Sequence, residues 1–504
     1  MRSTFYGLEI AKTGLFTAQN QLDLTSHNMA NADTVGYTRQ RLATAALPPG
    51  AKTKFIAEDI RTTSGRGVEA LHIEQIRNPF LDYQYRKENS TAMRLANKEQ
   101  YFSYVESLFN GELVDMKEAT GLTSMFEGFY NSLHALVETP SDPEIRANVR
   151  QNAIALTDSM NYYYNKLVEQ QDTLNESVRV AVNDVNEMSK EIADLNKQIY
   201  EFELNGARAN DLRDQRNLLL DEMSSIIKIE TYENSNGQLI VKSESRAFIS
   251  HNNYTEMAVV ADQTNPIAGE QDLYSVYWTD FNGNPTTPVN ITDGALKGFM
   301  DIRDGNDSKN IGIPFVIQQL NAVCKQVVEQ FNEVHRQGYT MPIGNGDTQT
   351  DVDFFDPTCI TAKDMKLSDA ILNNVNNIAA SDQPVGVDGE DNEQKGNGQI
   401  ALALCALINK TDEFGNPDNL NSKYKELLNT ISLEQSNIIN MNKTQTLLLA
   451  NVETQRKSVS DVSMDEELTN MVKFGHSYNA ASRMITAMDE ALEILINKMG
   501  LVGR

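Results

Sequence analysis

Few residues of this 504-residue chain have the types and spacing that catalysis or metal binding requires. The six histidines are scattered, and the chain contains no HExxH, GxSxG, Walker A or dinucleotide-binding motif. The three cysteines Cys324, Cys359 and Cys405 lie far apart without a CxxC pair, which fits neither a disulfide framework nor a zinc site. We therefore predict no enzymatic activity, no cofactor and no metal, and we expect the thiols to be small apolar core residues.

Two polar segments are weaker candidates for a site. Segment 344–353 carries carboxylate and amide oxygens at short spacing, but it lacks the terminal Glu and the flanking helices of an EF-hand. We favour a solvated loop there, with calcium binding as the alternative. Arg213 and Arg216 alternate with Asp211 and Asp214, and this pattern predicts surface ion pairs at a helix end rather than an anion site.

Composition narrows the class of protein. The chain has 44 Lys and Arg against 70 Asp and Glu, so its formal charge of −26 argues against nucleic acid as a partner. No stretch of 18 apolar residues is present, and residues 1–5 lack the apolar core of a cleaved signal peptide, so no membrane partner is expected. Composition alone would predict a cytoplasmic protein, and the length predicts two to four domains.

The clearest pattern lies at the two ends of the chain, where apolar residues recur at alternating steps of three and four. The N-terminal stripe consists of Leu8, Ala11, Leu15, Ala18, Leu22 and Met29. The C-terminal stripe consists of Met471, Phe474, Tyr478, Ala481, Ile485, Met488, Leu492, Leu495 and Met499. This is coiled-coil spacing, which predicts that the terminal helices pair with each other or with neighbouring copies. Docking of each helix on the chain's own core is the alternative that periodicity leaves open.

Long helices are also predicted between the two ends. A heptad array from Met160 to Phe202 predicts one helix of roughly 50 residues, about 75 Å long. A second helical stretch is expected at 89–138, followed by a break at 139–143, where two prolines and an Asp suit a turn and a new helix start. Another helix should follow Ile313 and end in a cap at Gly338, and helices at 400–404 and 422–458 should pack on the long array.

Two regions instead show the signals of strands. Residues 229–290 alternate apolar and polar side chains between turn residues, which predicts a small β domain inserted between helices. Residues 39–72 contain short β-compatible runs and glycines, and we expect a hairpin or an extended crossing there. The acidic region 344–398 is expected to be rich in loops, anchored in the core by Phe354 and Phe355.

Residues 22–40 carry a motif that resembles the N-terminal motif of bacterial flagellar axial proteins, the rod, hook and junction family. Its physical content is a helix stop. Asn28 and Asn31 are expected to tolerate left-handed backbone at the helix end, and Gly36 provides a turn before the aromatic anchor Tyr37. Residues 463–485, which include Leu468, are similar to the C-terminal consensus of the same family.

Internal segments narrow the resemblance to the hook-filament junction proteins of that family. Segments 139–153, 210–219, 292–304 and 331–339 are similar to elements of the junction proteins, and hook and distal-rod proteins lack the long internal helices. The β insertion and 344–398 are unmatched. Alternatives remain: hook-associated protein 3, a protein of the hook or rod type, or a coiled-coil effector or adhesin secreted by a type III system.

The resemblance implies a structural subunit of the bacterial flagellum that joins hook to filament. Such a protein is exported unfolded through the flagellar type III apparatus, is extracellular, and polymerises through its terminal helices. The implied partners are copies of itself, hook protein, hook-associated protein 3 as second junction protein, and a cytoplasmic export chaperone at the C-terminal helix. The predicted assembly interface consists of Leu8, Leu15, Leu22, Asn28, Met29, Asn31, Gly36, Tyr37, Leu468, Met471, Tyr478, Ile485, Met488, Leu492 and Leu495.

The expected fold is therefore mainly α with a β insertion, elongated and multidomain. We predict a terminal coiled-coil assembly domain from residues 1–35 and 464–504. Residues 36–228 and 291–463 should form a long-helix bundle domain with a β-hairpin region, and residues 229–290 a β-rich outer domain.

Overall fold

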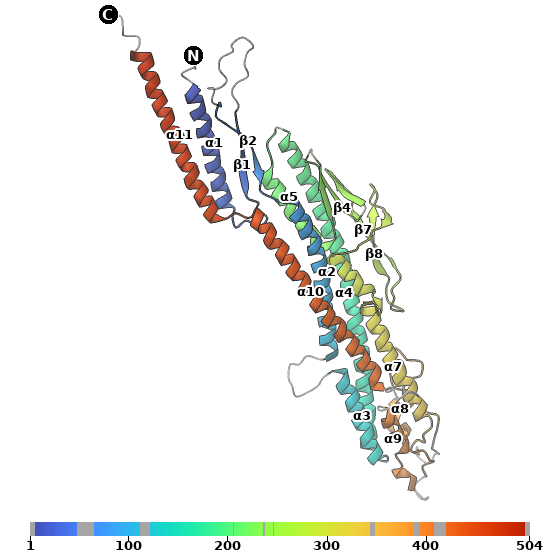
Figure 1. The fold of residues 1–504 in the computed structure, drawn as a ribbon. Helices are drawn as coiled ribbons and strands as arrows, with labels where there is room; N and C mark the ends of the chain where they lie inside the picture. Colours follow the sequence, from blue (N-terminus) through green and yellow to red (C-terminus); the bar gives the residue numbers. More distant parts are fainter. Residues whose placement is uncertain are drawn as a thin grey trace, which may run out of the picture.

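The computed structural model describes residues 6–47, 65–110, 121–204, 206–234, 237–244, 246–342, 348–386, 393–407 and 420–498. The molecule is long and narrow, with both ends of the chain at one tip (Figure 1). Helices dominate it and small sheets lie along one flank, so the expected elongated, mainly α fold with a β insertion is confirmed.

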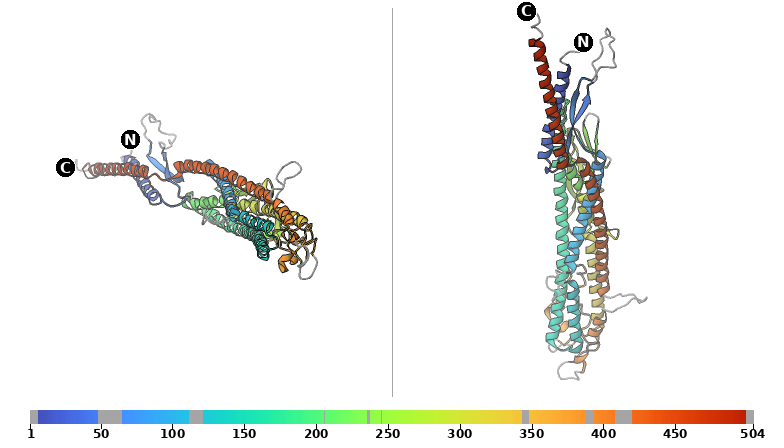
Figure 2. Two further views of the ribbon diagram at one scale, coloured as in Figure 1. Left: turned by 90° about the horizontal axis from the view of Figure 1, so that it is seen from below. Right: turned by 60° about the vertical axis from the view of Figure 1, so that its left-hand side comes forward.

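The two terminal helices lie side by side. Helix α1 (Tyr6–Ala30) packs along α11 (Met464–Lys498) in the opposite direction, as the views of Figure 2 also show. The predicted pairing of the two ends with each other is thus present within a single chain. Residues 499–504, which include the predicted stripe residue Met499, lie outside the described part.

The longest helix exceeds its prediction. Helix α4 (Pro143–Glu203) has 61 residues and begins well before Met160. Its start is set by Asp142, whose side chain accepts a hydrogen bond from the Glu144 N–H, and by Pro143 in the first turn. The stretch predicted at 89–138 is divided between α2 (Pro79–Asn110) and α3 (Leu122–Glu138), and residues 111–120 between them are not described.

Helix α7 (Ile313–His335) and helix α10 (Leu420–Ser460) complete the set of long helices. The partner predicted for the late helices is wrong. Helix α10 packs mainly on α2 and also on α7, and the short helix α9 (Gln399–Ala406) packs on α3 and α7 instead of α4. The Gly338 cap is also wrong, because α7 ends at His335 with Arg336 as its right-handed C-cap, and Gly338 is not among the described glycines with positive φ. Gly338 is needed for space: a Cβ there would lie 2.8 Å from that of Ala379.

An aromatic cluster fills the tip farthest from the chain ends. Phe129 of α3 and Phe331 of α7 meet Phe354 and Phe355, which are fully buried and confirm the predicted anchor. The surrounding region 348–386 is loop-rich as expected, with one short helix α8 (Asp369–Asn373) and a 3₁₀ turn η2 (Val375–Asn377), and η3 (Glu393–Gly396) follows. Cys324 and Cys405 are buried as expected, whereas Cys359 is partly exposed.

The candidate cation loop is only partly described, because 343–347 lie outside the described residues. Within the described part, the Asp353 carboxylate forms an ion pair with the Arg336 guanidinium at 2.6 Å. No group of three or more His, Cys, Asp and Glu side chains suited to a metal is found among the described residues. In the same residues, no helix combines the length and the apolar character that crossing a membrane requires.

Strands occupy both regions where they are predicted. β1 (Gln40–Ala46) and β2 (Val68–Gln75) pair antiparallel, which confirms the hairpin, and both contact α1. The insertion forms two antiparallel sheets. One consists of β3 (Glu230–Glu233), β4 (Leu239–Ser243), β5 (Arg246–Ser250) and β6 (Asn253–Tyr254), and the other of β7 (Met257–Gln263), β8 (Leu273–Thr279) and β9 (Pro285–Pro288).

The sheets have no hydrophobic core of their own. Val241, Phe248 and Trp278 share one buried cluster with Val182 of α4 and Leu220 of α5 (Asn210–Ile226). Helix α6 (Ala295–Asp304) joins the same cluster and returns the chain to α7 through the short strands β10 (Asn306–Asp307) and β11 (Asn310–Ile311). The three-domain division remains a prediction, and the shared core makes the sheets part of the helical region in packing terms.

Candidate functional site at the terminal helix pair

Small side chains of α1 form its seam with α11. Ala11, Ala18 and Thr25 are buried, and Gly7 lies so close to Met488 that a Cβ on Gly7 would be 2.5 Å from the Met488 Cε. Three heptads further along α1, Asn28 Nδ2 donates a 3.2 Å hydrogen bond to Glu467 Oε2. Positions 7 and 28 on one helix and 488 and 467 on the other are equally spaced, so one antiparallel register holds across three heptads.

This seam contains Ala11 and Ala18 of the stripe read in the sequence, but not its larger members. Leu8, Leu15, Leu22 and Met29 flank the seam and remain half-buried, while the smaller residues beside them point at α11. The sequence-based stripe on α11 is placed correctly, because Met471, Tyr478, Ile485, Met488 and Leu492 are all half-buried. Leu468 is 48 % exposed, and the side chain of Leu495 is not among those described.

Asn28 is the centre of the hydrogen-bond network at the foot of the pair. Its Oδ1 accepts bonds from the Tyr37 hydroxyl at 2.8 Å and from the Gln40 N–H at 3.1 Å, and its Nδ2 donates to the Gln40 carbonyl at 2.9 Å as well as to Glu467. The buried amide thus has two donors and two acceptors satisfied. The expected left-handed backbone at Asn28 and Asn31 is wrong: neither is among the described non-glycine residues with positive φ.

The predicted helix stop is made in another way. The Asn31 side chain donates a 3.0 Å hydrogen bond back to the His27 carbonyl and satisfies that end of α1. Gly36 then adopts a φ of 81°, which confirms the predicted turn. Tyr37 follows and packs its ring edge-on against His27. Burial, together with Asp211, Asp214 and Glu467, raises the Tyr37 pKa, so the hydroxyl stays protonated and donates to Asn28.

Arg39 and Glu467 connect the pair to the rest of the molecule, and sequence reasoning missed both. The Arg39 guanidinium lies 2.8 Å from Glu467 and 2.6 Å from Glu466, and its backbone N–H donates to the Ser460 carbonyl at 2.8 Å. Glu467 is 3 % exposed and Glu466 is 62 % exposed, so only the first carboxylate is shielded from water. The sequence does show the acidic pair Glu466 and Glu467 in the C-terminal motif. It does not show that Arg39, 428 residues from Glu467, is their partner.

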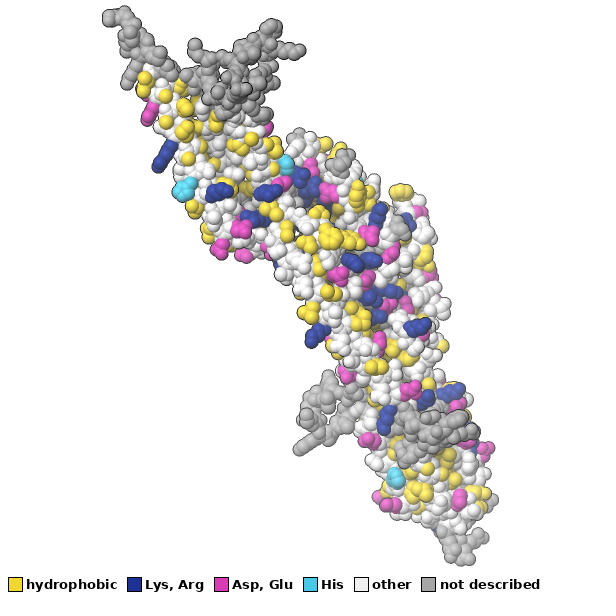
Figure 3. Space-filling model, in the orientation of Figure 1, with side chains coloured by type: hydrophobic (Ala, Val, Ile, Leu, Met, Phe, Trp, Pro, Cys, Tyr) yellow, Lys and Arg dark blue, Asp and Glu magenta, His cyan; other side chains and the backbone are white. Residues whose placement is uncertain are grey.

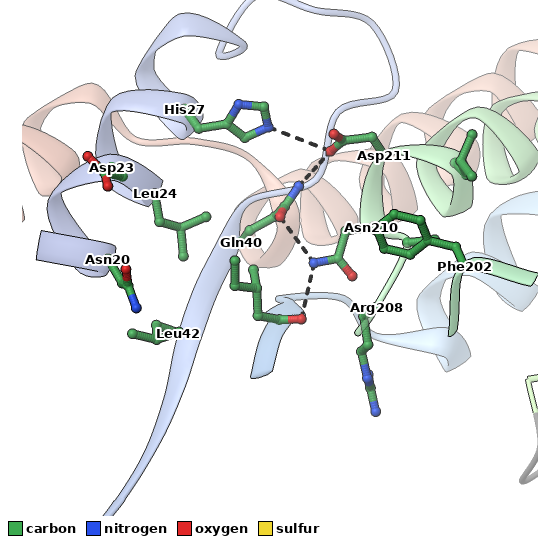
Figure 4. A pocket seen from close by; sticks show the side chains of 13 residues that line it. Asn20, Asp23, Leu24, His27, Gln40, Leu42, Phe202, Arg208, Asn210 and Asp211 are labelled. Carbon is green, nitrogen blue, oxygen red and sulfur yellow. Dashed lines mark hydrogen bonds and ion pairs between the residues drawn. The ribbon is translucent and has the colours of Figure 1, made fainter. Parts of the chain in front are cut away.

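A cavity of about 480 Å³ opens beside this network, between α1, the β1–β2 hairpin and the start of α5 (Figure 4). Leu24 and Leu42 supply apolar walls. On the opposite side His27 lies 3.6 Å from Asp211, which also accepts a 2.9 Å hydrogen bond from Gln40. The arrangement packs and hydrogen-bonds α1, the hairpin and the start of α5 to one another.

The prediction that the charged side chains of 211–216 form a set of surface ion pairs is wrong. Asp214 is buried and accepts from the Thr38 N–H at 3.0 Å and from Gln75 at 2.8 Å, and burial raises its pKa to about 6. Arg216 is also buried and holds Glu233 of β3 at 2.9 Å, while Arg213 pairs with Glu203 and Glu233. The start of α5 therefore ties the hairpin, α4 and the β sheets together.

Comparison with known proteins identifies the family. Curated relatives match along nearly the whole chain: the flagellar hook-associated protein 1 of Bacillus subtilis is 31 % identical and covers 100 % of both chains. The chain belongs to the flagellar hook-associated protein 1 family. Members from Escherichia coli and Salmonella typhimurium are 21 % and 22 % identical, each covering 97 % of this chain and 98 % of its own length.

Family models match three parts of this hook-associated protein 1 family member. Residues 106–355 match the flagellar hook-associated protein FlgK helical domain. Residues 8–38 match the flagella basal body rod protein, and residues 456–498 match the FlgEFG protein C-terminal region of the basal body rod. The last two ranges cover most of α1 and α11. They contain Asn28 and Glu467, and the first of them ends one residue before Arg39. The two terminal helices thus match models of basal body rod proteins, whereas the helical middle matches a hook-associated protein model.

A solved structure shows the same fold. The flagellar hook junction protein FlgK from Burkholderia pseudomallei superimposes with a TM-score of 0.58 at 14 % identity, covering 75 % of this chain and 100 % of the other. This likeness shows the fold alone. By its curated relatives and the matched helical-domain model, the chain is a flagellar component of the hook-associated type, with the roles in flagellum assembly and motility that this family has.

Proposed function

We propose that this chain is a structural, non-catalytic subunit that joins hook to filament and polymerises through α1 and α11. The observation that carries the proposal is the apolar surface left on the terminal pair. Val472 is 61 % exposed and Met484 52 % exposed, and Phe16 and Ile494 are similarly open. Figure 3 shows apolar side chains gathered on this part of the molecule. Monomeric proteins rarely leave so many large apolar side chains along one element.

These side chains lie away from the seam. The half-buried Leu8, Leu15, Leu22 and Met29 form one flank of α1, so the pair presents apolar residues on more than one side. Burying each large apolar side chain contributes roughly 1.5–3 kcal/mol, and contact with neighbouring copies would supply that burial. The predicted interface residues are therefore proposed to contact other subunits, with Asn28, Asn31, Gly36 and Tyr37 shaping the foot of the pair.

The remaining partners are proposed from the family resemblance and from the same surface. We propose hook protein on one side and hook-associated protein 3 on the other as neighbours, and an extracellular location after export in unfolded form through the flagellar type III apparatus. Before export, the exposed apolar residues of α11 would need cover in the cytoplasm, and a chaperone bound to α11 would provide it. The acidic surface and the absence of a membrane-spanning helix in the described residues agree with this route.

Substitution on α11 tests polymerisation. Met484→Glu places a charge on the exposed apolar surface, and Ser482→Glu places the same charge on a neighbouring exposed polar position as the matched control. We expect Met484→Glu to keep the helix content of the full chain but to lose incorporation into flagella, while Ser482→Glu incorporates normally. Equal incorporation of both variants would contradict polymerisation through this surface.

Antibody labelling of intact flagella tests the location. A single band between hook and filament would support the proposal, whereas labelling along the filament would exclude it. A chain ending after Asp461 should keep a cooperative melt of the long-helix region and lose both incorporation and chaperone binding. Normal assembly of that shortened chain would refute a role of α11.

A further inference from the structure

The seam between α1 and α11 poses a problem of register. Small and apolar layers repeat every seven residues on both helices, so sliding one helix by a heptad would again bring small residues opposite large ones. For example, Gly7 lies against Met488, and a slide of seven residues would bring Gly14 to the same place. Apolar repeats of this kind specify register weakly, and a single buried polar layer is what commonly specifies it in helix pairs.

The described seam has one such charged layer, at Glu467. Its two carboxylate oxygens are taken by different elements: Oε2 accepts from Asn28 of α1, and Oε1 accepts from Arg39 just before β1. A slide of seven residues in one direction would carry Glu467 to Gln21, between Ala18 and Thr25 and away from both partners. In the other direction Glu467 would pass the end of α1 at Ala30. Either shift leaves a buried carboxylate without these bonds, which is costly.

The same layer also determines how the pair meets the rest of the molecule. Asn28 and Gln40 exchange two hydrogen bonds, and the Gln40 side chain continues to Asn210 at 3.0 Å and to Asp211. The contacts of Gln40 with Asn210 and Asp211 are drawn in Figure 4. If α11 slid alone, Glu467 would lose its partners. If α1 moved with it, the link between α1, the hairpin and α5 would break.

We infer that Glu467 is the positioning residue that sets the antiparallel register of the two terminal helices. Glu466 is the built-in comparison, because it binds the same Arg39 guanidinium from a position that is 62 % exposed, whereas Glu467 binds it from within the seam. The inference concerns the pairing of this chain's own ends, so it stands or falls independently of the proposed place in the flagellum.

Cysteine crosslinking in the full-length purified chain tests the register. In a Cys359→Ser background, Gly7→Cys with Met488→Cys reports the observed register, and Gly14→Cys with Met488→Cys reports a one-heptad slide. Each reporter pair is combined with Glu467→Ala or with Glu466→Ala and treated with a short bifunctional thiol reagent. With Glu467 intact, we expect only the first pair to crosslink.

With Glu467→Ala, we expect the ratio of slid to observed product to rise at least about tenfold, which corresponds to about 1.4 kcal/mol. Glu466→Ala should leave the ratio unchanged. Glu467→Gln, which keeps the size and an acceptor for Asn28, should shift the ratio in the same direction by less. An unchanged ratio in Glu467→Ala overturns the inference. So does loss of both products, because Glu467 would then be required for pairing itself, and so does an equal shift in Glu466→Ala.

Discussion

Acid should destabilise the far tip of this protein through one buried histidine. His335, at the end of α7, is fully buried. Its Nδ1 lies 2.7 Å from the Val352 carbonyl oxygen, and its Nε2 accepts a 2.8 Å hydrogen bond from the Ala379 N–H. A ring that donates from Nδ1 and accepts at Nε2 must be neutral. Protonation would place a hydrogen on Nε2 against the Ala379 N–H and break this link.

The magnitude follows from the pKa. Burial, with a smaller contribution from Arg146, lowers the His335 pKa from 6.5 to about 4. Because the folded pKa is the lower one, the unfolded chain binds more protons between pH 6.5 and pH 4, and stability is lost as pH falls through that window. At 1.36 kcal/mol per pKa unit the full effect is about 3 kcal/mol, of which about 2 kcal/mol should be lost between pH 7 and pH 4.5.

Urea melts at pH 7 and pH 4.5 measure this loss. Other carboxylates also titrate in this range, so the informative quantity is the difference between wild type and His335→Gln at each pH. At pH 7 the variant should be the less stable, because glutamine cannot make both hydrogen bonds, and the gap should shrink by about 2 kcal/mol at pH 4.5. His134→Gln, at an exposed histidine of α3, is the control and should show no such change. A gap for His335→Gln that is independent of pH would refute the reasoning.

Three further predictions concern single positions and are checked by denaturant melts of the full chain. Gly294→Ala should cost more than about 2 kcal/mol, because φ is 97° there and a Cβ would lie 2.3 Å from the Ile226 carbonyl oxygen. Gly14→Ala should stabilise α1 by up to about 1 kcal/mol, because a Cβ there meets no atom within 4 Å and alanine favours helix. Arg146→Met should cost about 2–4 kcal/mol, because the buried guanidinium donates to the carbonyls of Pro140 at 2.6 Å and Ile378 at 2.5 Å, and both would be left unpaired. Arg150→Met, which removes an exposed hydrogen bond to the Leu372 carbonyl, should cost less than about 1 kcal/mol. Similar losses for Arg146→Met and Arg150→Met would contradict the third prediction.

Much of the fold was predictable because its signals are local. Heptad spacing along α4 and α11 extends over many turns, and the alternation in 229–290 marks strands directly. One helix start was also accessible: the two prolines and the Asp of 139–143 predict a turn and a new helix, and α4 begins at Pro143 with Asp142 as its cap. Element types followed from periodicity, whereas boundaries depended on single capping bonds.

The partners of the helices were not predictable in the same way. Helix α10 lies along α2 and not along α4, although both neighbours would bury its apolar residues. Periodicity tells which face of a helix is apolar, but it does not tell which of several apolar faces will meet it. The same limit applies to the seam of α1. The predicted stripe held leucines and alanines alike, and only the structure shows that Gly7, Ala11 and Ala18 let α11 approach closely while the leucines flank the seam.

The amino-acid sequence by itself determined the mainly α fold, the amphipathic character of both ends and the turn at Gly36, because each depends on residues close together in the chain. Only the tertiary structure decided the register of α1 against α11 and the burial of Glu467, Arg216 and Asp214. Those features require charged and amide groups of different elements to meet away from water, from 17 residues apart for Arg216 and Glu233 to 439 for Asn28 and Glu467. A buried hydrogen bond of this kind is stabilising only when all of its partners are in place.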